Sequence, residues 1–176
     1  MLPNLQKIHH VAYRCINAKE TVEFYQKVLG MDFQLAISED YVPSTGEHDP
    51  YMHIFLDAGG GNVLAFFELP KHPEMGFDPN SPKWVQHIAF AVKDYDALMA
   101  AKEHIENLGI EVIGPTNHTI FKSIYFFDPN GHRLELAADC ATQEQMAELK
   151  RVAPIMINEW NETKIAPKHA AWLHEN

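Results

Sequence analysis

A histidine, a tyrosine and a glutamate that could share proton-transfer or metal chemistry lie within residues 116–135. Residues 128–131, Asp-Pro-Asn-Gly, predict a type I turn followed by a left-handed glycine, which makes a three-residue hairpin loop with a bulge. This turn sets the register of the two flanking strands so that Tyr125 lies directly across from Glu135 on one face of a sheet. His118 could join them from the preceding loop. We therefore expect three titratable groups to converge there.

The spacing of these three residues matches a known family motif. Six residues separate His118 from Tyr125, nine separate Tyr125 from Glu135, and the Asp-Pro-x-Gly turn stands between the last two. This pattern resembles the signature of the type I extradiol ring-cleaving dioxygenases of the vicinal oxygen chelate superfamily. The resemblance implies that Glu135 is an iron ligand and that His118 and Tyr125 sit beside the substrate. Without it, Tyr125 would be read as a packing aromatic and Glu135 as a solvent-facing carboxylate.

The chain also contains an internal repeat. Residues 10–15 (HVAYRC) align with residues 87–92 (HIAFAV), at an offset of 77 residues. Each segment is followed by a predicted helix, at about 18–29 and 95–108, and each helix ends at a Leu-Gly pair. Three predicted strands follow each helix. Because one such module buries too little apolar surface alone, we expect two paired βαβββ modules that enclose a shared metal cavity.

The predicted fold is therefore α+β, and the resemblance implies the vicinal oxygen chelate fold. Predicted strands after the first helix span residues 33–39, 51–57 and 63–69, and those after the second span 111–113, 121–127 and 132–137. The predicted organisation is a first module at 1–70, a connector at 71–85, a second module at 86–139 and a C-terminal helical extension at 140–176.

Two histidines occupy equivalent positions in the repeat. His10 and His87 each open the first strand of a module, and pseudo-symmetric packing would bring both to one cavity. With Glu135 they make two imidazoles and one carboxylate, a facial set that suits non-haem Fe(II) and leaves positions open for substrate and O2. His9 is expected to point to the opposite face of the strand. The other histidines are taken as structural or surface residues, among them His53, His72, His104, His132, His169 and His174.

Glu68 offers a different ligand set. Residues 66–69 (FFEL) align by sequence with residues 133–136 (RLEL), which makes Glu68 the first-module counterpart of Glu135. If Glu68 also points inward, the set becomes two histidines and two glutamates, which resembles glyoxalase I and related isomerases that hold Zn(II) or Ni(II). The ring-cleaving family also carries a first-module histidine that acts as base. Asn62 stands roughly in that place here, which leaves the base unassigned.

Composition and charge argue against several partner classes. A net charge of −10 argues against nucleic acid or an anionic membrane, because both require a basic surface. No run approaches the about 20 apolar residues that span a bilayer, and the first ten residues lack a signal-peptide core, so we expect a cytoplasmic protein. Cys15 and Cys140 are predicted to be free thiols.

Several stretches lie outside the repeated elements. Residues 70–84 contain four prolines and are predicted to connect the modules. Residues 38–50 are polar and irregular, and they are read either as an entrance flap or as a plain surface loop.

The C-terminal extension is predicted to be helical. Thr142 with Gln145 makes a capping box for a helix to about residue 152, Pro154 is expected to end it, and residues 155–164 are expected to form a second short helix. Residues 166–174 carry aromatic side chains and are predicted to dock over the cavity mouth or on a subunit partner.

The motif and the ligand set together predict an enzyme, an Fe(II)-dependent extradiol dioxygenase that cleaves a catechol-type ring with O2. The first alternative is a glyoxalase-I-like isomerase, epimerase or lyase with Zn(II) or Ni(II), in which Glu68 or Glu135 moves a proton of an enediolate. The second alternative is a binding protein without chemistry, like the drug-sequestering members of the same fold. The expected partners are a small catechol-type molecule and O2, with no nucleic acid or membrane. A homo-oligomer is left open.

Overall fold

Each half of the internal repeat folds as a strand, a helix and three strands. The computed structural model describes residues 5–175. The first half supplies β1 (Val11–Cys15), α1 (Ala18–Leu29), β2 (Phe33–Tyr41), β3 (His48–Asp57) and β4 (Val63–Glu68). The second half supplies β5 (His87–Ala91), α2 (Tyr95–Asn107), β6 (Ile113–Asn117), β7 (Phe121–Phe127) and β8 (Arg133–Asp139). After them come α3 (Gln143–Thr163) and the short 3-10 helix η1 (Ala171–His174).

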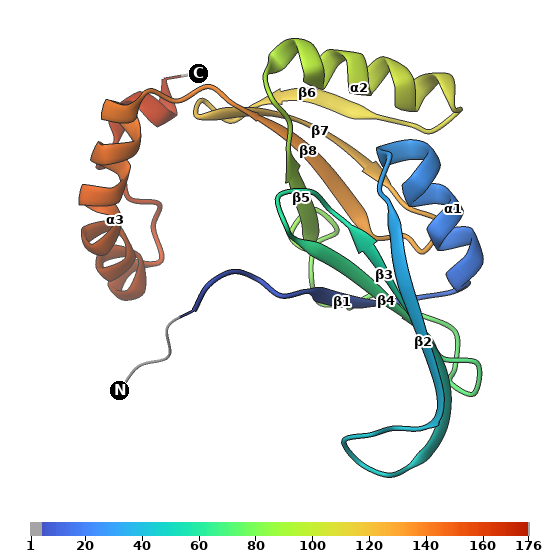
Figure 1. The fold of residues 1–176 in the computed structure, drawn as a ribbon. Coiled ribbons are helices and arrows are strands. Elements are labelled where there is room, and N and C mark those ends of the chain that lie inside the picture. Colours follow the sequence, from blue (N-terminus) through green and yellow to red (C-terminus); the bar gives the residue numbers. More distant parts are fainter. Residues whose placement is uncertain (1–4, 176) are drawn as a thin grey trace. The chain divides into compact units, whose positions relative to one another are not determined.

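The strands form two four-stranded sheets with the same order. The first sheet runs β1-β4-β3-β2 and the second β5-β8-β7-β6 (Figure 1). In the first sheet β1 lies parallel to β4, whereas β3 is antiparallel to both β2 and β4. The predicted duplication and the α+β fold class are therefore confirmed.

The chain forms two compact units. One comprises the described residues up to Ile88 together with Phe127–Leu134, and the other comprises Ala89–Phe126 together with the chain from Glu135 onward. In the first unit α1 packs its buried residue Tyr25 against Phe66 of β4, with ring centroids 5.2 Å apart. The boundaries predicted from the sequence for modules, connector and extension remain a proposal.

Helix α1 begins and ends where the sequence predicts. The Asn17 side chain accepts a hydrogen bond from the backbone N–H of Glu20, and the chain leaves the helix at Gly30 with a φ of 66°. A helix start leaves backbone N–H groups unpaired, and an asparagine side chain accepts from one of them. A helix often ends at a left-handed residue, and glycine adopts that conformation without strain. Asp94 caps α2 in the same way, through the N–H of Ala97.

The predicted hairpin turn is present, and the side chains of Asp128 and Asn130 are buried in it. The Gly131 N–H donates to the Asp128 carbonyl at 2.9 Å, the Asp128 N–H donates to the His132 carbonyl at 3.0 Å, and Gly131 has a φ of 84°. Within the first unit, the Asn130 Oδ1 accepts from the Ile16 N–H at 2.8 Å. These bonds fix the register of β7 and β8.

The strand boundaries predicted from the sequence are wrong in two regions. The polar stretch at 38–50 is mostly paired, because β2 runs on to Tyr41 and β3 starts at His48, so that only residues 42–47 form the turn of a long hairpin (Figure 1). The strand predicted at 111–113 instead forms at Ile113–Asn117. It lies at the edge of its sheet, where Pro115, which has no N–H to donate, is tolerated.

Pro154 does not end the C-terminal helix. The capping box between Thr142 and Gln145 is present, but α3 continues through Pro154 to Thr163 as one helix. A proline inside a helix removes one N–H bond and crowds the carbonyl four residues before it, and in this helix neither effect stops propagation. In the part of the chain that the structure describes, no helix has the length and apolar character needed to cross a membrane.

The C-terminal segment docks, and the surface it docks on is α3. Trp172 donates from Nε1 to Glu148 at 3.3 Å, and His169 contacts Glu159 at 2.6 Å. Ala170 is fully buried. The tail is docked, as predicted, and its contacts are with α3, whereas docking over the cavity mouth or on a subunit partner stays a prediction. The His174 side chain lies outside what the structure describes.

The two cysteines are free, as predicted, and they are expected to differ in reactivity. Cys15 is buried, and burial raises the pKa of its thiol to about 11, whereas Cys140 is exposed. Because the thiolate is the nucleophile, the folded protein should react at about one thiol with Ellman's reagent at about pH 8, and at both after denaturation. Cys140→Ser should bring the folded value to about zero. Equal rates at the two thiols in the folded protein would contradict this.

Candidate metal and substrate site

The three residues of the sequence motif lie in one hydrogen-bonded chain. Within the second unit, His118 Nε2 is 2.7 Å from the Tyr125 hydroxyl, and that hydroxyl donates to Glu135 Oε1 at 3.2 Å. A phenol has one proton, so when that proton is directed to the carboxylate the phenolic oxygen can accept from a His118 tautomer protonated on Nε2. Tyr125 and Glu135 are both buried. The predicted convergence is therefore present, while the roles of these residues remain proposals.

Ser123 also belongs to this cluster, and sequence reasoning missed it. Its hydroxyl donates to the same oxygen of Glu135, Oε1, and the serine is fully buried. Ser123 stands two residues before Tyr125 on β7, so it faces the same side of the sheet. The alternation of side chains along a strand could have identified Ser123 from the sequence.

The turn between β6 and β7 places His118. The His118 N–H donates to the Phe121 carbonyl at 2.9 Å, and Thr119 adopts a left-handed φ of 70°. Asn117 accepts from the Thr119 N–H at 2.9 Å. This closed turn holds the imidazole beside Phe121, with ring centroids 4.7 Å apart.

In the first unit, His10 stands among aromatic rings. Its centroid is 6.1 Å from that of His53 and 5.8 Å from that of Phe55. His9 Nδ1 lies 2.8 Å from His10 Nδ1, so the prediction that His9 points to the opposite face is wrong. The reason is that β1 begins at Val11, so strand alternation does not govern the two residues before it.

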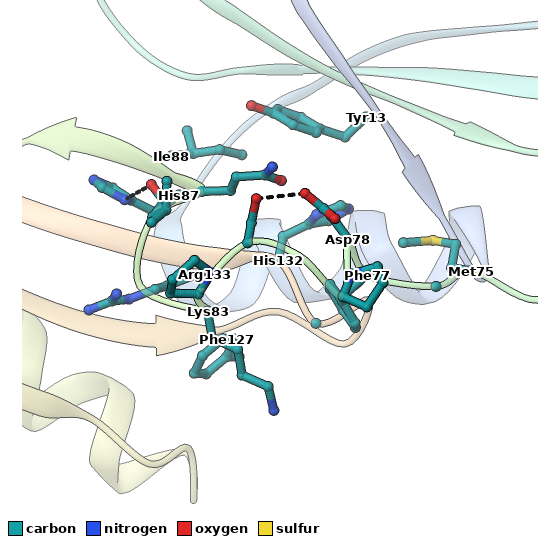
Figure 2. Close-up of a pocket in the computed structure, with 17 residues that line it drawn as sticks. Tyr13, Met75, Phe77, Asp78, Lys83, His87, Ile88, Phe127, His132 and Arg133 are labelled. Atoms are coloured by element: carbon teal, nitrogen blue, oxygen red, sulfur yellow. Dashed lines mark hydrogen bonds between the residues drawn. The ribbon is translucent and has the colours of Figure 1, made fainter. Parts of the chain in front are cut away.

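His87 is oriented by the backbone of the connector. Its Nδ1 lies 3.0 Å from the Val85 carbonyl (Figure 2). A carbonyl can only accept, so Nδ1 carries the proton in this hydrogen bond. In the neutral imidazole this leaves the lone pair on Nε2, which is the tautomer that can bind a metal.

The structure does not gather the whole predicted ligand set. Across residues 5–175, no three or more His, Cys, Asp or Glu side chains form a group that could hold a metal ion. His10 and His87 belong to the first unit, and Glu135 belongs to the second. The donor types suit Fe(II), and the orientation of His87 and the burial of Glu135 fit a ligand role. The site remains a proposal.

Glu68 is not the counterpart of Glu135. The Ala58 N–H donates to the Asn62 carbonyl just as that of Asp128 donates to His132, both at 3.0 Å. These equivalent turns are offset by 70 residues, which aligns Glu135 with Ala65. The alignment by letter pattern is wrong because it ignored the turn. Glu68 Oε2 accepts from the Ala18 N–H at 2.7 Å, at the start of α1.

Glu68→Ala is expected to leave metal binding intact and to lower stability by about 1 kcal/mol, because a helix N–H loses its carboxylate partner. Thermal unfolding and metal content of the same samples measure both effects. Glu68→Gln, which keeps an acceptor oxygen, should lose less stability. A loss of metal in both variants would restore Glu68 as a ligand.

A cavity of about 1010 Å³ in the first unit is lined largely by the connector (Figure 2). Its walls carry the rings of Tyr13, Phe77 and Phe127 and the cationic side chains of Lys83 and Arg133. His87 also lines it. The connector was predicted only to join the modules, and its apolar residues were the missed signal.

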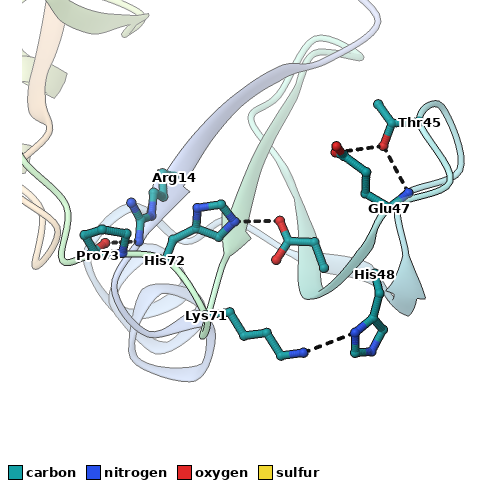
Figure 3. Close-up of polar contacts among 8 residues, drawn as sticks. Arg14, Thr45, Glu47, His48, Lys71, His72 and Pro73 are labelled. Atoms are coloured by element: carbon teal, nitrogen blue, oxygen red, sulfur yellow. Dashed lines mark hydrogen bonds and ion pairs between the residues drawn. The ribbon is translucent and has the colours of Figure 1, made fainter.

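Polar contacts tie the start of the connector to the first sheet (Figure 3). Arg14 on β1 donates to the Pro73 carbonyl at 2.5 Å, and His72 contacts Asp49 at 2.6 Å. Lys71 lies 3.4 Å from His48 Nδ1. The connector is therefore anchored just ahead of its residues that line the cavity.

A family model for the Glyoxalase/Bleomycin resistance protein/Dioxygenase superfamily matches residues 7–136. The chain belongs to this superfamily. The match includes strands of both sheets and ends one residue beyond Glu135, so it includes every residue of the predicted site. The family expected from the motif is confirmed.

Known relatives differ in how much of their length the chain spans. "Putative ring-cleaving dioxygenase MhqA" of Bacillus subtilis (strain 168) is 30% identical over 136 residues, which cover 75% of this chain and 40% of MhqA. "Uncharacterized protein YwkD" of the same organism is 32% identical over 133 residues, covering 75% of this chain and 96% of YwkD. The chain thus matches less than half of MhqA.

Among solved structures, a point mutant of the fosfomycin resistance protein FosX from Listeria monocytogenes, in complex with Mn(II) and a dihydroxypropylphosphonic acid, has the same fold. Its TM-score is 0.56 at 19% identity, with 82% of this chain and 99% of FosX covered. Members of the superfamily therefore include proteins that bind divalent metals and small molecules.

Proposed function

We propose that this protein is an Fe(II)-dependent extradiol dioxygenase that cleaves a catechol-type ring with O2. The observation that carries the proposal is the chain of hydrogen bonds from His118 through Tyr125 to Glu135. It joins an imidazole, through a phenol, to a carboxylate proposed as a metal ligand. Ring cleavage of a diol needs such proton-handling groups beside the metal.

The proposed metal ligands are His10, His87 and Glu135. Iron bound there would act as a Lewis acid toward the two diol oxygens and supply the electrons that activate O2. The carboxylate already has two hydroxyl donors, Ser123 and Tyr125, on Oε1. Those donors hold its orientation, as supporting groups commonly do for metal ligands.

Tyr125 and His118 are assigned to the substrate. When substrate binds, the Tyr125 hydroxyl would turn its single proton from Glu135 to the deprotonated diol oxygen and so stabilise negative charge on it. His118, within hydrogen-bond distance of the phenol, would supply a proton to oxygen as the ring opens. Burial of Tyr125 keeps water from competing for this hydrogen bond.

The relatives support this choice without fixing the substrate. MhqA bears the name of a ring-cleaving dioxygenase, although this chain matches only part of it. The four-ligand arrangement of glyoxalase I has less support, because Glu68 is engaged at the start of α1. The three-ligand set that remains is the one that leaves coordination positions for a diol and O2.

Metal analysis of anaerobically purified protein, followed by O2 uptake on a panel of catechols, tests the proposal. We expect about one iron per chain, O2 consumption only with vicinal diols, and a yellow ring-opened product. Zinc or nickel in place of iron, with no O2 uptake after iron is supplied, would contradict the dioxygenase and favour an isomerase or lyase.

A further inference from the structure

The cavity of about 1010 Å³ in the first unit has walls of aromatic rings that the fold leaves partly exposed (Figure 2). Phe77 is 60% exposed, and Tyr13 and Phe127 are exposed to a smaller extent. Small-molecule pockets are concave, are lined mainly by apolar and aromatic side chains, and have volumes of about 300–1,000 Å³. The cavity thus has the size and the walls of a site for a ligand with aromatic rings.

Phe77 is held in place although most of it is exposed. A Cβ atom added at Gly131 would overlap the Phe77 ring, so the ring rests on the glycine of the hairpin turn. The next connector residue, Asp78, accepts hydrogen bonds from the Asn80 N–H at 2.9 Å and from the Ser81 hydroxyl at 2.6 Å. A wall that is already ordered loses little conformational entropy when a ligand binds, so this cavity is prepared for a ligand.

The charge of the cavity is opposite in sign to the charge of the chain as a whole. Lys83 and Arg133 line it with two positive charges. Asp78 is the single carboxylate among its lining residues, all of which lie in the described part of the chain. With histidines counted neutral, this leaves one excess positive charge in the cavity, whereas the chain has a net charge of −10. An anion is therefore favoured here over the rest of the surface.

Asp78 does not reverse this preference. The hydrogen bonds from the Ser81 hydroxyl and the Asn80 N–H lower the pKa of its carboxyl group, so the group is ionised. Each of its two oxygens, however, already accepts one of these hydrogen bonds, so a cationic ligand would have to compete with them. Arg133 is half-buried, and water screens a charge in that setting less than a fully exposed one.

Arg133 lies beside an aromatic part of the wall. At the end of the hairpin the Asp128 N–H donates to the His132 carbonyl at 3.0 Å. Phe127 and Arg133 are therefore the next opposed pair, and opposed residues project to the same face of a sheet. A guanidinium is planar and can form two parallel hydrogen bonds with one carboxylate. A ring that carries a carboxylate can thus contact the phenyl ring and the guanidinium together.

We propose that this cavity binds an aromatic carboxylate. Its ring system packs against Tyr13, Phe77 and Phe127, and its carboxylate pairs with Arg133. Lys83, which is exposed, adds a second positive charge at the same cavity. Binding of this kind uses no metal ion and does not depend on the proposed function.

The probes are three molecules with one ring system and different charges: 2-naphthoate, neutral 2-naphthalenemethanol and the 2-naphthylmethylammonium cation. Each is titrated by calorimetry into the intact chain as purified, and again with EDTA present, so that no metal ion can hold the carboxylate. We expect the anion to bind about tenfold more tightly than the alcohol, because a charge-assisted hydrogen bond is about twice as strong as a neutral one. The cation should bind most weakly.

Variants locate the site within the cavity. Arg133→Gln should weaken the anion by about tenfold and leave the affinity for the alcohol unchanged. Lys83→Gln should weaken the anion by about two- to fivefold, as expected for an exposed charge. Phe77→Ala should weaken both probes, because it removes part of the aromatic wall. Arg151→Gln, in an exposed arginine of α3 that does not line the cavity, is the control and should bind like the parent protein.

Preference for the anion that persists with EDTA and disappears in Arg133→Gln supports the site. Equal affinity of the parent protein for anion and alcohol overturns it, as does tighter binding of the cation. Binding of the anion that is lost with EDTA also overturns it, because a metal ion would then hold the carboxylate. Unchanged binding of every probe in Phe77→Ala excludes the cavity as their location. If Arg133→Gln does not fold, unchanged affinity for the anion in Lys83→Gln overturns the site.

The proposed function is tested by different measurements. Iron content and O2 uptake on catechols are not read in these titrations, and the titrations with EDTA proceed without iron. Failure of the naphthoate site therefore leaves the dioxygenase in place, and failure of the dioxygenase leaves the naphthoate site in place.

Discussion

Replacing Glu135 by alanine is expected to remove iron from the protein. Three protein ligands leave no redundancy, and even changes to groups that only support ligands reduce metal affinity by about 10 to 100-fold. Loss of the only proposed carboxylate ligand should therefore reduce it further and abolish activity. Iron per chain after anaerobic reconstitution measures the effect. His87→Ala should behave in the same way.

The alanine variant needs a control for folding, because Glu135 is buried with Ser123 and Tyr125 as donors. Glu135→Gln keeps an acceptor oxygen for both hydroxyls but removes the charge that a metal needs. It should fold normally and still bind iron poorly. Ser123→Ala removes only one supporting bond, so it should lose less iron than either Glu135 variant. Full iron content in both Glu135 variants would exclude the carboxylate as a ligand.

Local chemistry made much of this cluster readable from the sequence. The Asp-Pro-x-Gly turn has a single favoured geometry, and once it is placed, the pairing of Tyr125 with Glu135 follows by counting. The structure has that turn, with Gly131 at a φ of 84°, and the hydrogen bond between the two side chains. The ends of α1 were equally predictable, because Asn17 and Gly30 satisfy needs that any helix has.

Prediction failed where contacts between elements outweigh local pattern. The letter pattern aligned Glu68 with Glu135, but strand register and the start of α1 give Glu68 a different partner. His53 looked like an ordinary strand histidine, and its ring contacts with Phe67 and His10 come from other segments of the chain. Pro154 was expected to end a helix that in fact continues. The contacts of Glu68 and His53 cannot be read from neighbouring residues in the sequence.

Sequence analysis also did not predict that the connector lines a cavity. Its prolines predicted irregular backbone correctly, but irregular backbone can either span a gap or line a pocket. The hydrogen bonds of Arg14 and His72 favour the second role, because they fix the first residues of the connector against β1 and β3. Those partners lie far apart in the sequence from the residues that they hold.

Tyr125→Phe is expected to keep iron and to lower turnover by about 10² to 10³-fold. A donor aimed at charge that develops on substrate oxygen typically contributes that much to the rate, and this hydrogen bond is the role proposed for the phenol. Steady-state O2 uptake, normalised to iron content, gives the measurement. Tyr95→Phe, in a half-exposed tyrosine of α2, is the matched control and should leave turnover unchanged. Loss of iron in Tyr125→Phe would make the phenol a metal-site residue instead.

The link between Tyr125 and His118 adds a sharper test. The His118 Nε2 is 2.7 Å from the phenolic oxygen, so the two side chains should act as one unit in moving a proton. Residues that act as a unit lose their effect together, so His118→Gln combined with Tyr125→Phe should be little slower than the more damaging single variant. If the two reductions in rate instead multiply, the imidazole and the phenol act independently on the substrate, and the hydrogen bond between them has no part in the reaction.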